Sequence, residues 1–352
     1  MKALSLVTLS LHFVAVMLLV GSLGAAIWFN FVGHRSNDAD RLTASQILAN
    51  RLPTTMTFLI NLGVPPLLFA QVLYGRALYT SSVLIAVSWI SVIFLLILAY
   101  WLIYKMQDAI RNQKPAWWIG LLSLLVVMGI GRIYSLNMTL MLKPEVWPQM
   151  YAANPQGLGT PPIDPTITPR WMFVMMGGFI VGGLWLMLLA NMTHLADGVR
   201  SALKKTGAIM PLIGAIPQIF FAYRTYSLQD PAVQNSLSTT PIHRISTLVY
   251  LAAVVVVALL CLRQLTAGPS RGLAITGIVF AFLSSVATVV YRDGMRDYIL
   301  SAKGFNVWDR QEASNWSVII LFLLLFVAML GIVGWLLSVV KRATPPEEQI
   351  AL

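Results

Sequence analysis

Apolar segments of about 20 residues recur along the whole chain, each long enough to cross the roughly 30 Å hydrocarbon core of a membrane as a helix. In lipid the backbone polar groups must be hydrogen-bonded internally, so single apolar runs of this length fold as helices. No polar stretch between them is long enough for a separate water-soluble domain. The sequence therefore predicts an all-α protein, a polytopic transmembrane helix bundle forming one integral membrane domain over residues 1–352.

The chain divides into about nine predicted spans, within a range of about eight to ten. Their approximate limits are 4–32, 55–75, 81–105, 116–136, 170–193, 207–226, 244–264, 272–291 and 316–340. Two larger connecting loops are predicted at 143–169 and 292–315. The first apolar run exceeds the roughly 7–15-residue core of a secretion signal, so we interpret it as a retained first helix.

The composition agrees with a membrane protein and with a lipid bilayer as its first partner. Only 11% of the residues are charged, against about 25% in soluble domains. The net charge is +11, but most basic residues follow apolar runs, which is typical of membrane topology and not of nucleic-acid binding. The excess of basic residues in alternate loops predicts an external N-terminus, a cytoplasmic C-terminus and an external position for both larger loops.

The absence of several sequence motifs argues against some classes of cofactor and enzyme. The single cysteine, Cys261, excludes an intrachain disulfide, and without a Cys-x-x-Cys-His motif this chain carries no covalently attached c-type haem. A His-Glu-x-x-His motif is also absent, and so is a phosphate-binding loop. The sequence thus gives no support to a hydrolytic enzyme.

Histidine is the usual protein ligand of haem iron, and the chain has four of them. The predicted topology sorts them into an outer pair, His12 and His243, and an inner pair, His34 and His194. We predict His12 and His243 as ligands of a b-type haem iron. The alternative, that all four are ordinary helix-end residues, stays open, because familiar two-haem bundles place their ligands on only two helices.

Arg132 lies well inside an apolar stretch. A charge at that depth usually faces the interior of a bundle, where this one would contact a haem propionate, a quinone oxygen or an anionic substrate. The alternative is that the helix ends near Arg132, so that its long side chain extends to the lipid headgroups.

Residues 61–75 contain Pro65 and Pro66 within an apolar run, flanked by Asn61 and Gln71. Because proline removes backbone hydrogen bonds, we predict a bent helix in which Asn61 and Gln71 line a quinone pocket. A purely structural kink is the alternative. The span 207–226 also contains two prolines, which favours a short or re-entrant helix there.

Two further patterns concern packing and charge. The glycine pairs 177–178 and 182–183 predict a close approach between two helices. Arg292, Asp293, Arg296 and Asp297 are spaced to pair along one helical face. We interpret these four as a solvated extension of the eighth span, with a docking surface for an external partner as the alternative.

The run 61–75, followed by residues 79–82, resembles a stretch in bacterial multi-pass membrane proteins that are associated with respiratory multihaem c-type cytochromes. The resemblance implies an inner-membrane subunit of an electron-transfer complex, or, if an enzyme, a quinone-linked oxidoreductase subunit. It would exchange electrons between the quinone pool and a partner cytochrome on the external face. Two rival functions stay open: a transporter or channel for a small or anionic solute, and a cofactor-free membrane anchor.

Overall fold

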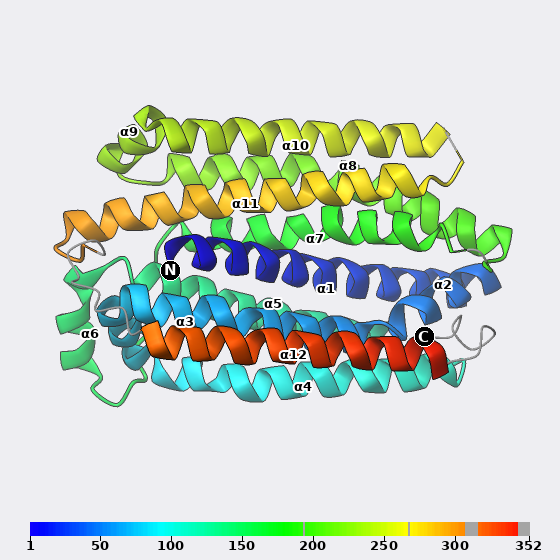
Figure 1. Cartoon of the computed structure of the whole chain (residues 1–352), viewed down its shortest axis with the longest axis horizontal. Helices are drawn as coiled ribbons and strands as arrows, with labels where there is room; N and C mark the ends of the chain where they lie inside the picture. Colours follow the sequence, from blue (N-terminus) through cyan, green and yellow to red (C-terminus); the bar gives the residue numbers. More distant parts are fainter. Residues whose placement is uncertain (193, 267, 307–315, 344–352) are drawn as a thin grey trace. The chain divides into compact units, whose positions relative to one another are not determined.

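The computed structural model describes residues 1–192, 194–266, 268–306 and 316–343, and these ranges are almost entirely helical (Figure 1). The helices are α1 (Lys2–Ser36), α2 (Ala39–Ala49), α3 (Leu52–Leu84), α4 (Ala86–Arg111), α5 (Trp117–Leu140), the 3-10 turn η1 (Pro144–Val146), α6 (Trp147–Ala153), α7 (Ile167–Leu189), α8 (Asp197–Ser227), α9 (Pro231–Thr239), α10 (Pro241–Thr266), α11 (Arg271–Ala302) and α12 (Trp316–Ala343). Among the described residues, nine candidate spans are long and apolar enough to cross a membrane. The predicted fold class is therefore confirmed.

The prolines do not interrupt the helices as the sequence predicted. Helix α8 runs for 31 residues through Pro211 and Pro217, so the prediction of a short or re-entrant helix at 207–226 was wrong. Helix α3 also continues through Pro65 and Pro66, but it is kinked at Tyr74 (φ −123°, ψ 20°), within the run 61–75 for which a bent helix was predicted. Membrane helices tolerate internal prolines when neighbouring helices pack against them, and α8 packs closely on α7.

The chain forms two compact units, Met1–Phe305 and Asn306–Leu352, which are described separately. In the first unit α1 is the central helix and contacts α2, α3, α5, α7 and α11. Helix α7 is also interior, since 61% of an apolar 18-residue stretch of this helix is buried. In the second unit the described helix is α12.

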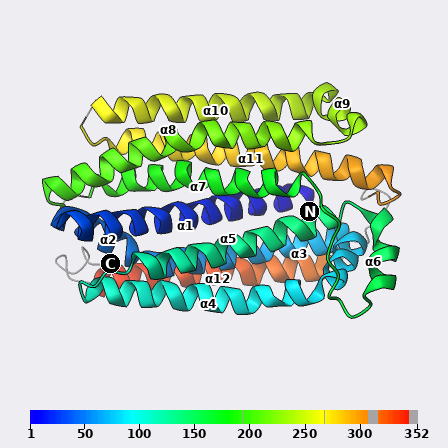
Figure 2. The same ribbon diagram turned by 180° about the vertical axis from the view of Figure 1, so that it is seen from behind.

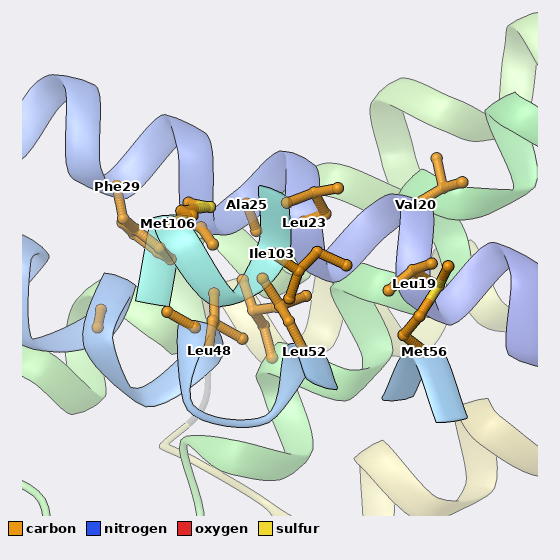
Figure 3. Packing of buried hydrophobic residues seen from close by; sticks show 14 of the residues in the cluster. Leu19, Val20, Leu23, Ala25, Phe29, Leu48, Leu52, Met56, Ile103 and Met106 are labelled. Carbon is orange, nitrogen blue, oxygen red and sulfur yellow. The ribbon is translucent and has the colours of Figure 1, made fainter. Parts of the chain in front are cut away.

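The largest apolar core of the first unit surrounds the inward face of α1 (Figure 3). Leu19, Leu23 and Phe29 are buried almost completely and meet side chains from α2, α3 and α4. A buried polar contact also joins α1 to the start of α5, because the Asn30 side-chain oxygen accepts the Ala116 backbone N–H at 2.8 Å. Close packing of these apolar side chains joins α1, α2, α3 and α4 in one core.

Glycines allow α1 and α7 to approach backbone to backbone. A Cβ atom at Gly21 would overlap the carbonyl oxygen of Gly178, and it would lie 2.7 Å from the Cα of Gly182. Only residues without a side chain fit at such a contact. The close approach predicted from the glycine pairs is confirmed.

Both predicted larger loops contain more helix than the sequence indicated. The segment 143–169 includes η1 and α6, which lie at the same end of the first unit as the N-terminus (Figure 1, Figure 2). Residues 292–302 are not a loop but the last turns of α11. Residues 307–315, the rest of the second predicted loop, lie outside the described residues.

An ion pair between Lys143 and Asp164 stabilises the connecting segment 143–169. Asp164 accepts hydrogen bonds from Lys143 at 2.6 Å and from the Thr166 backbone at 2.7 Å. Partial burial opposes ionisation, but these hydrogen bonds and the Lys143 charge lower the pKa of the Asp164 carboxyl below its ordinary value.

We therefore expect Asp164→Asn to destabilise the protein at neutral pH and to have little effect in strong acid. The folded-state pKa is lowered, so the carboxylate stabilises the fold above its unfolded-state pKa of about 3.9. That contribution is lost as the pH falls through the lower folded-state value. Thermal unfolding midpoints of both proteins, measured at neutral pH and near pH 3, test this; a difference that does not shrink in acid contradicts it.

Candidate functional site

A buried network of charged side chains joins α1, α3 and α11 at the N-terminal end of α1. The Lys2 ammonium donates to the Tyr74 hydroxyl at 2.6 Å, to Asp293 Oδ2 at 2.7 Å and to Asp297 Oδ2 at 2.5 Å. An ammonium group has three protons, so these contacts use each of them. Lys2 thereby holds the ends of three helices together.

Tyr74 and Arg296 complete this network. The Tyr74 hydroxyl faces Asp297 Oδ1 at 2.7 Å and Asp293 Oδ1 at 3.1 Å, and its one proton serves the nearer carboxylate. Arg296 donates to Asp293 Oδ1, and its guanidinium carbon lies 3.8 Å from the centroid of the Tyr74 ring. Asp293 is 8% exposed and Arg296 is 5% exposed, so the charges are stabilised by one another and not by water.

The predicted helical, salt-bridged extension of the eighth span is confirmed, because α11 runs to Ala302 and Arg296 forms an ion pair with Asp293, but the burial of both side chains shows that the prediction of a solvated extension was wrong. Helix α11 continues past Tyr291, and the face carrying Asp293 and Arg296 packs toward α1 and α3. Sequence reasoning noted the acidic and basic spacing but missed Lys2 and Tyr74. The available signal was topological: Lys2 and Asp293 lie at span ends that the predicted topology places on one side of the membrane.

Next to the network lie two arginines with few partners. The Arg292 guanidinium carbon is 5.8 Å from the centroid of the Phe13 ring, and no hydrogen bond or ion pair joins Arg292 to another described side chain. Arg170 donates to Thr139 Oγ1 at 3.4 Å, but its buried Nε has no partner. Arg292 lies on α11 one turn before Arg296.

His12 lies half-buried between α1 and α3, beside the same Phe13 ring. Its Nδ1 is 3.2 Å from the Leu59 carbonyl oxygen, and because a carbonyl only accepts, Nδ1 carries the proton and donates. The Nε2 lone pair is then free to bind a ligand. Metal-binding histidines in proteins are commonly oriented by this arrangement.

His243 has a different environment. It is buried against α11, where a Cβ atom at Gly294 would overlap its Nε2, and its Nδ1 has no hydrogen-bond partner. His12 therefore contacts α3 and His243 contacts α11, so the structure places the two imidazoles in separate helix contacts. Their pairing on one haem iron stays a prediction. Of the inner pair, His34 lies in the last turn of α1 and His194 is exposed after α7.

The other predicted site residues lie apart from this network. Arg132 donates to Thr168 Oγ1 at 3.2 Å and lies 5.7 Å from the Trp171 ring, so it joins α5 to α7. Asn61 is exposed and donates to the Thr57 carbonyl one turn earlier, while Gln71 is half-buried. No described contact joins Asn61 to Gln71. The electrostatic role of Arg132 and the quinone pocket at Asn61 and Gln71 stay predictions.

An open cavity of about 480 Å³ lies instead beside α4. Its lining residues are Asn50, Pro53, Tyr104, Lys105, Gln107, Asp108 and Arg111.

The sequence matches none of the known protein-family models, and no functionally curated protein is detectably similar to it. The fold, however, is similar to a solved structure, that of the bd oxidase from Geobacillus thermodenitrificans. The TM-score is 0.72 at 13% sequence identity, and the match covers 98% of this chain and 98% of that chain. At this identity the similarity establishes the fold: a multi-pass helix bundle of the kind found in a chain of that oxidase.

Proposed function

We propose that the protein is a redox subunit of a respiratory complex in the bacterial inner membrane. In this role it exchanges electrons between the quinone pool and a partner c-type cytochrome on the external face, with its N-terminus outside and its C-terminus in the cytoplasm. The similarity to the bd oxidase chain carries this proposal, because it extends over 98% of both chains. An oxidase is a redox protein, and this fold therefore favours redox function over transport.

We propose that His12 would hold a non-covalently bound b-type haem, and the orientation of its ring supports this. Nδ1–H is held by the Leu59 carbonyl, so His12 would bind the haem iron through Nε2. The unpaired guanidinium of Arg292 lies beside the neighbouring Phe13 ring and supplies positive charge close by. When bound, the haem supplies one-electron redox chemistry; the chain supplies the ligand and excludes water.

His243 is supported less well as the second ligand, because its Nε2 is packed against Gly294. We keep the quinone pocket at Asn61 and Gln71 as part of the proposal, although the exposed position of Asn61 would place that pocket at the lipid-facing surface.

A reduced-minus-oxidised visible spectrum of the purified protein tests the haem assignment. We expect a b-type signal in the wild type, loss of most of it in His12→Ala, and an unchanged signal in His194→Ala. His194 is the matched control because it is exposed and outside the spanning helices. His243→Ala separates two versions of the site: its signal disappears if both histidines bind the iron and survives if His12 is the only histidine ligand.

A colourless preparation, obtained with haem supply and partner subunits present during expression, would reject the haem. A signal that persists in His12→Ala would reject His12 as its ligand. In the first case the cofactor-free anchor and the transporter are the functions to test, the latter by solute flux in proteoliposomes.

A further inference from the structure

The open cavity of about 480 Å³ lies at the end of α4, at the opposite end of the first unit from the N-terminus of the chain (Figure 1). Helix α4 has 26 residues, so it is about 39 Å long and exceeds the roughly 30 Å hydrocarbon core of a membrane. Its last turns therefore reach the level of the lipid headgroups. These turns line the cavity together with Asn50 and Pro53, at the junction of α2 and α3.

Positive charge exceeds negative charge in the lining of this cavity. Lys105 and Arg111 supply two exposed cations, and Asp108 supplies one exposed carboxylate. Within the described ranges no ion pair joins Asp108 to either cation, and neither cation donates a hydrogen bond. The Lys105 ammonium lies 5.8 Å from the centroid of the Trp101 ring, and Asp108 accepts from the Asn112 amide at 3.5 Å. The donors of both cations are therefore available to an anionic ligand.

An exposed apolar stripe on α4 leads to the cavity. It consists of Ile90, Phe94, Ile97, Trp101 and Tyr104, which follow one another at intervals of three or four residues and so share one face of the helix. Each of these side chains is between 49% and 67% exposed. The same interval continues from Tyr104 to Asp108 and Arg111, so the stripe and the charged lining lie on one face. Its aromatic residues occupy the end nearest the cavity, as is usual at a membrane interface.

We propose that the cavity binds the headgroup of an anionic phospholipid, whose acyl chains lie along the apolar stripe. The phosphate oxygens accept hydrogen bonds from Lys105 and Arg111, and a guanidinium can donate to two of them at once. Basic pockets beside spanning helices commonly bind anionic lipid headgroups. A free phosphate would occupy the charged lining but leave the stripe uncovered, so the continuous face favours a lipid. This site requires neither a haem nor a quinone.

Lipid binding to the full-length protein in detergent tests this site. Native mass spectrometry measures the Kd of dioleoyl phosphatidylglycerol, which is anionic, and of dioleoyl phosphatidylcholine, which has the same acyl chains but no net charge. Each basic side chain near the headgroups favours an anionic lipid by about fivefold, and Asp108 offsets one of the two cations. We therefore expect the wild type to bind phosphatidylglycerol about fivefold more tightly than phosphatidylcholine.

Three variants locate this preference. Lys105→Gln combined with Arg111→Gln abolishes it, whereas Asp108→Asn, which removes the opposing carboxylate, increases it by about a further fivefold. The matched control is Arg263→Gln combined with Arg271→Gln, which also removes two exposed cations, from α10 and α11 and outside the cavity, and keeps the preference. Because all five side chains are exposed, the thermal unfolding midpoints in lipid-free detergent should match that of the wild type.

Equal affinities of the wild type for the two lipids would overturn the proposal. A preference that survives in the double cavity variant, or that disappears in the control, would also overturn it, because the charge effect would then arise elsewhere. Inorganic phosphate is the probe without acyl chains. We expect phosphatidylglycerol to stay bound when sodium phosphate replaces sodium chloride at equal ionic strength; if phosphate displaces it at concentrations close to the Kd of the lipid, the ligand is a free anion and the lipid assignment is wrong.

Discussion

Asp293→Ala is expected to lower the free energy of unfolding by about 3–5 kcal/mol, because it breaks a buried ion-pair network by removing one partner. Arg296 then loses its paired carboxylate while remaining 5% exposed, and Lys2 loses one of the two carboxylates with which it forms ion pairs. Unfolding monitored in detergent by circular dichroism, against temperature or denaturant, measures the change.

The chain offers a control with the same spacing on a helix. Asp197 and Arg200 are also three residues apart and form an ion pair at 3.4 Å, but the Asp197 side chain is fully exposed. Asp197→Ala is expected to leave the free energy of unfolding almost unchanged, since water and salt weaken exposed pairs. Equal losses in the two variants would show that the buried network does not stabilise the fold.

Gly21→Ala is the second change with a large expected effect. Its methyl group would overlap the carbonyl oxygen of Gly178, which is backbone and has no rotamer to adopt, so α1 and α7 must separate. We expect the free energy of unfolding to fall by about 1–3 kcal/mol, the range for an overpacked core, and the yield of folded protein to be lower.

Gly24→Ala is its control on the same helix, one turn further along. A Cβ atom at Gly24 meets no atom within 4 Å, and alanine has the higher helix propensity by up to about 1 kcal/mol. This variant is expected to be neutral or slightly stabilising. A loss at Gly24 as large as that at Gly21 would mean that helix flexibility, and not the contact with α7, sets the requirement for glycine.

The sequence predicts best those structural features that depend on a single segment of the chain. Apolar length alone predicts the spanning helices, and paired glycines predict a close contact between α7 and a neighbour. Proline was a poorer guide: Pro211 and Pro217 lie within an unbroken α8, because packing against other helices compensates for the missing hydrogen bonds.

The candidate site was predicted only in part, because it depends on contacts between segments that lie far apart in the sequence. His12 was identified because histidine is rare within apolar runs, and Arg132 for its charge. The contacts of Lys2 with Asp293 and of Tyr74 with Asp297 join residues 291 and 223 positions apart. No local pattern encodes such a pairing, since it depends on which helix ends become neighbours.

The length of that separation has a consequence for biosynthesis. Lys2 precedes its acidic partner Asp293 on α11 by 291 residues, so it is synthesised and inserted well before that partner. Throughout insertion the early helices α1 and α3 thus carry an ammonium and a phenol without their final acceptors. Closure of this network marks the arrival of α11, so a chain truncated before α11 retains a polar end of α1 without its acidic partners.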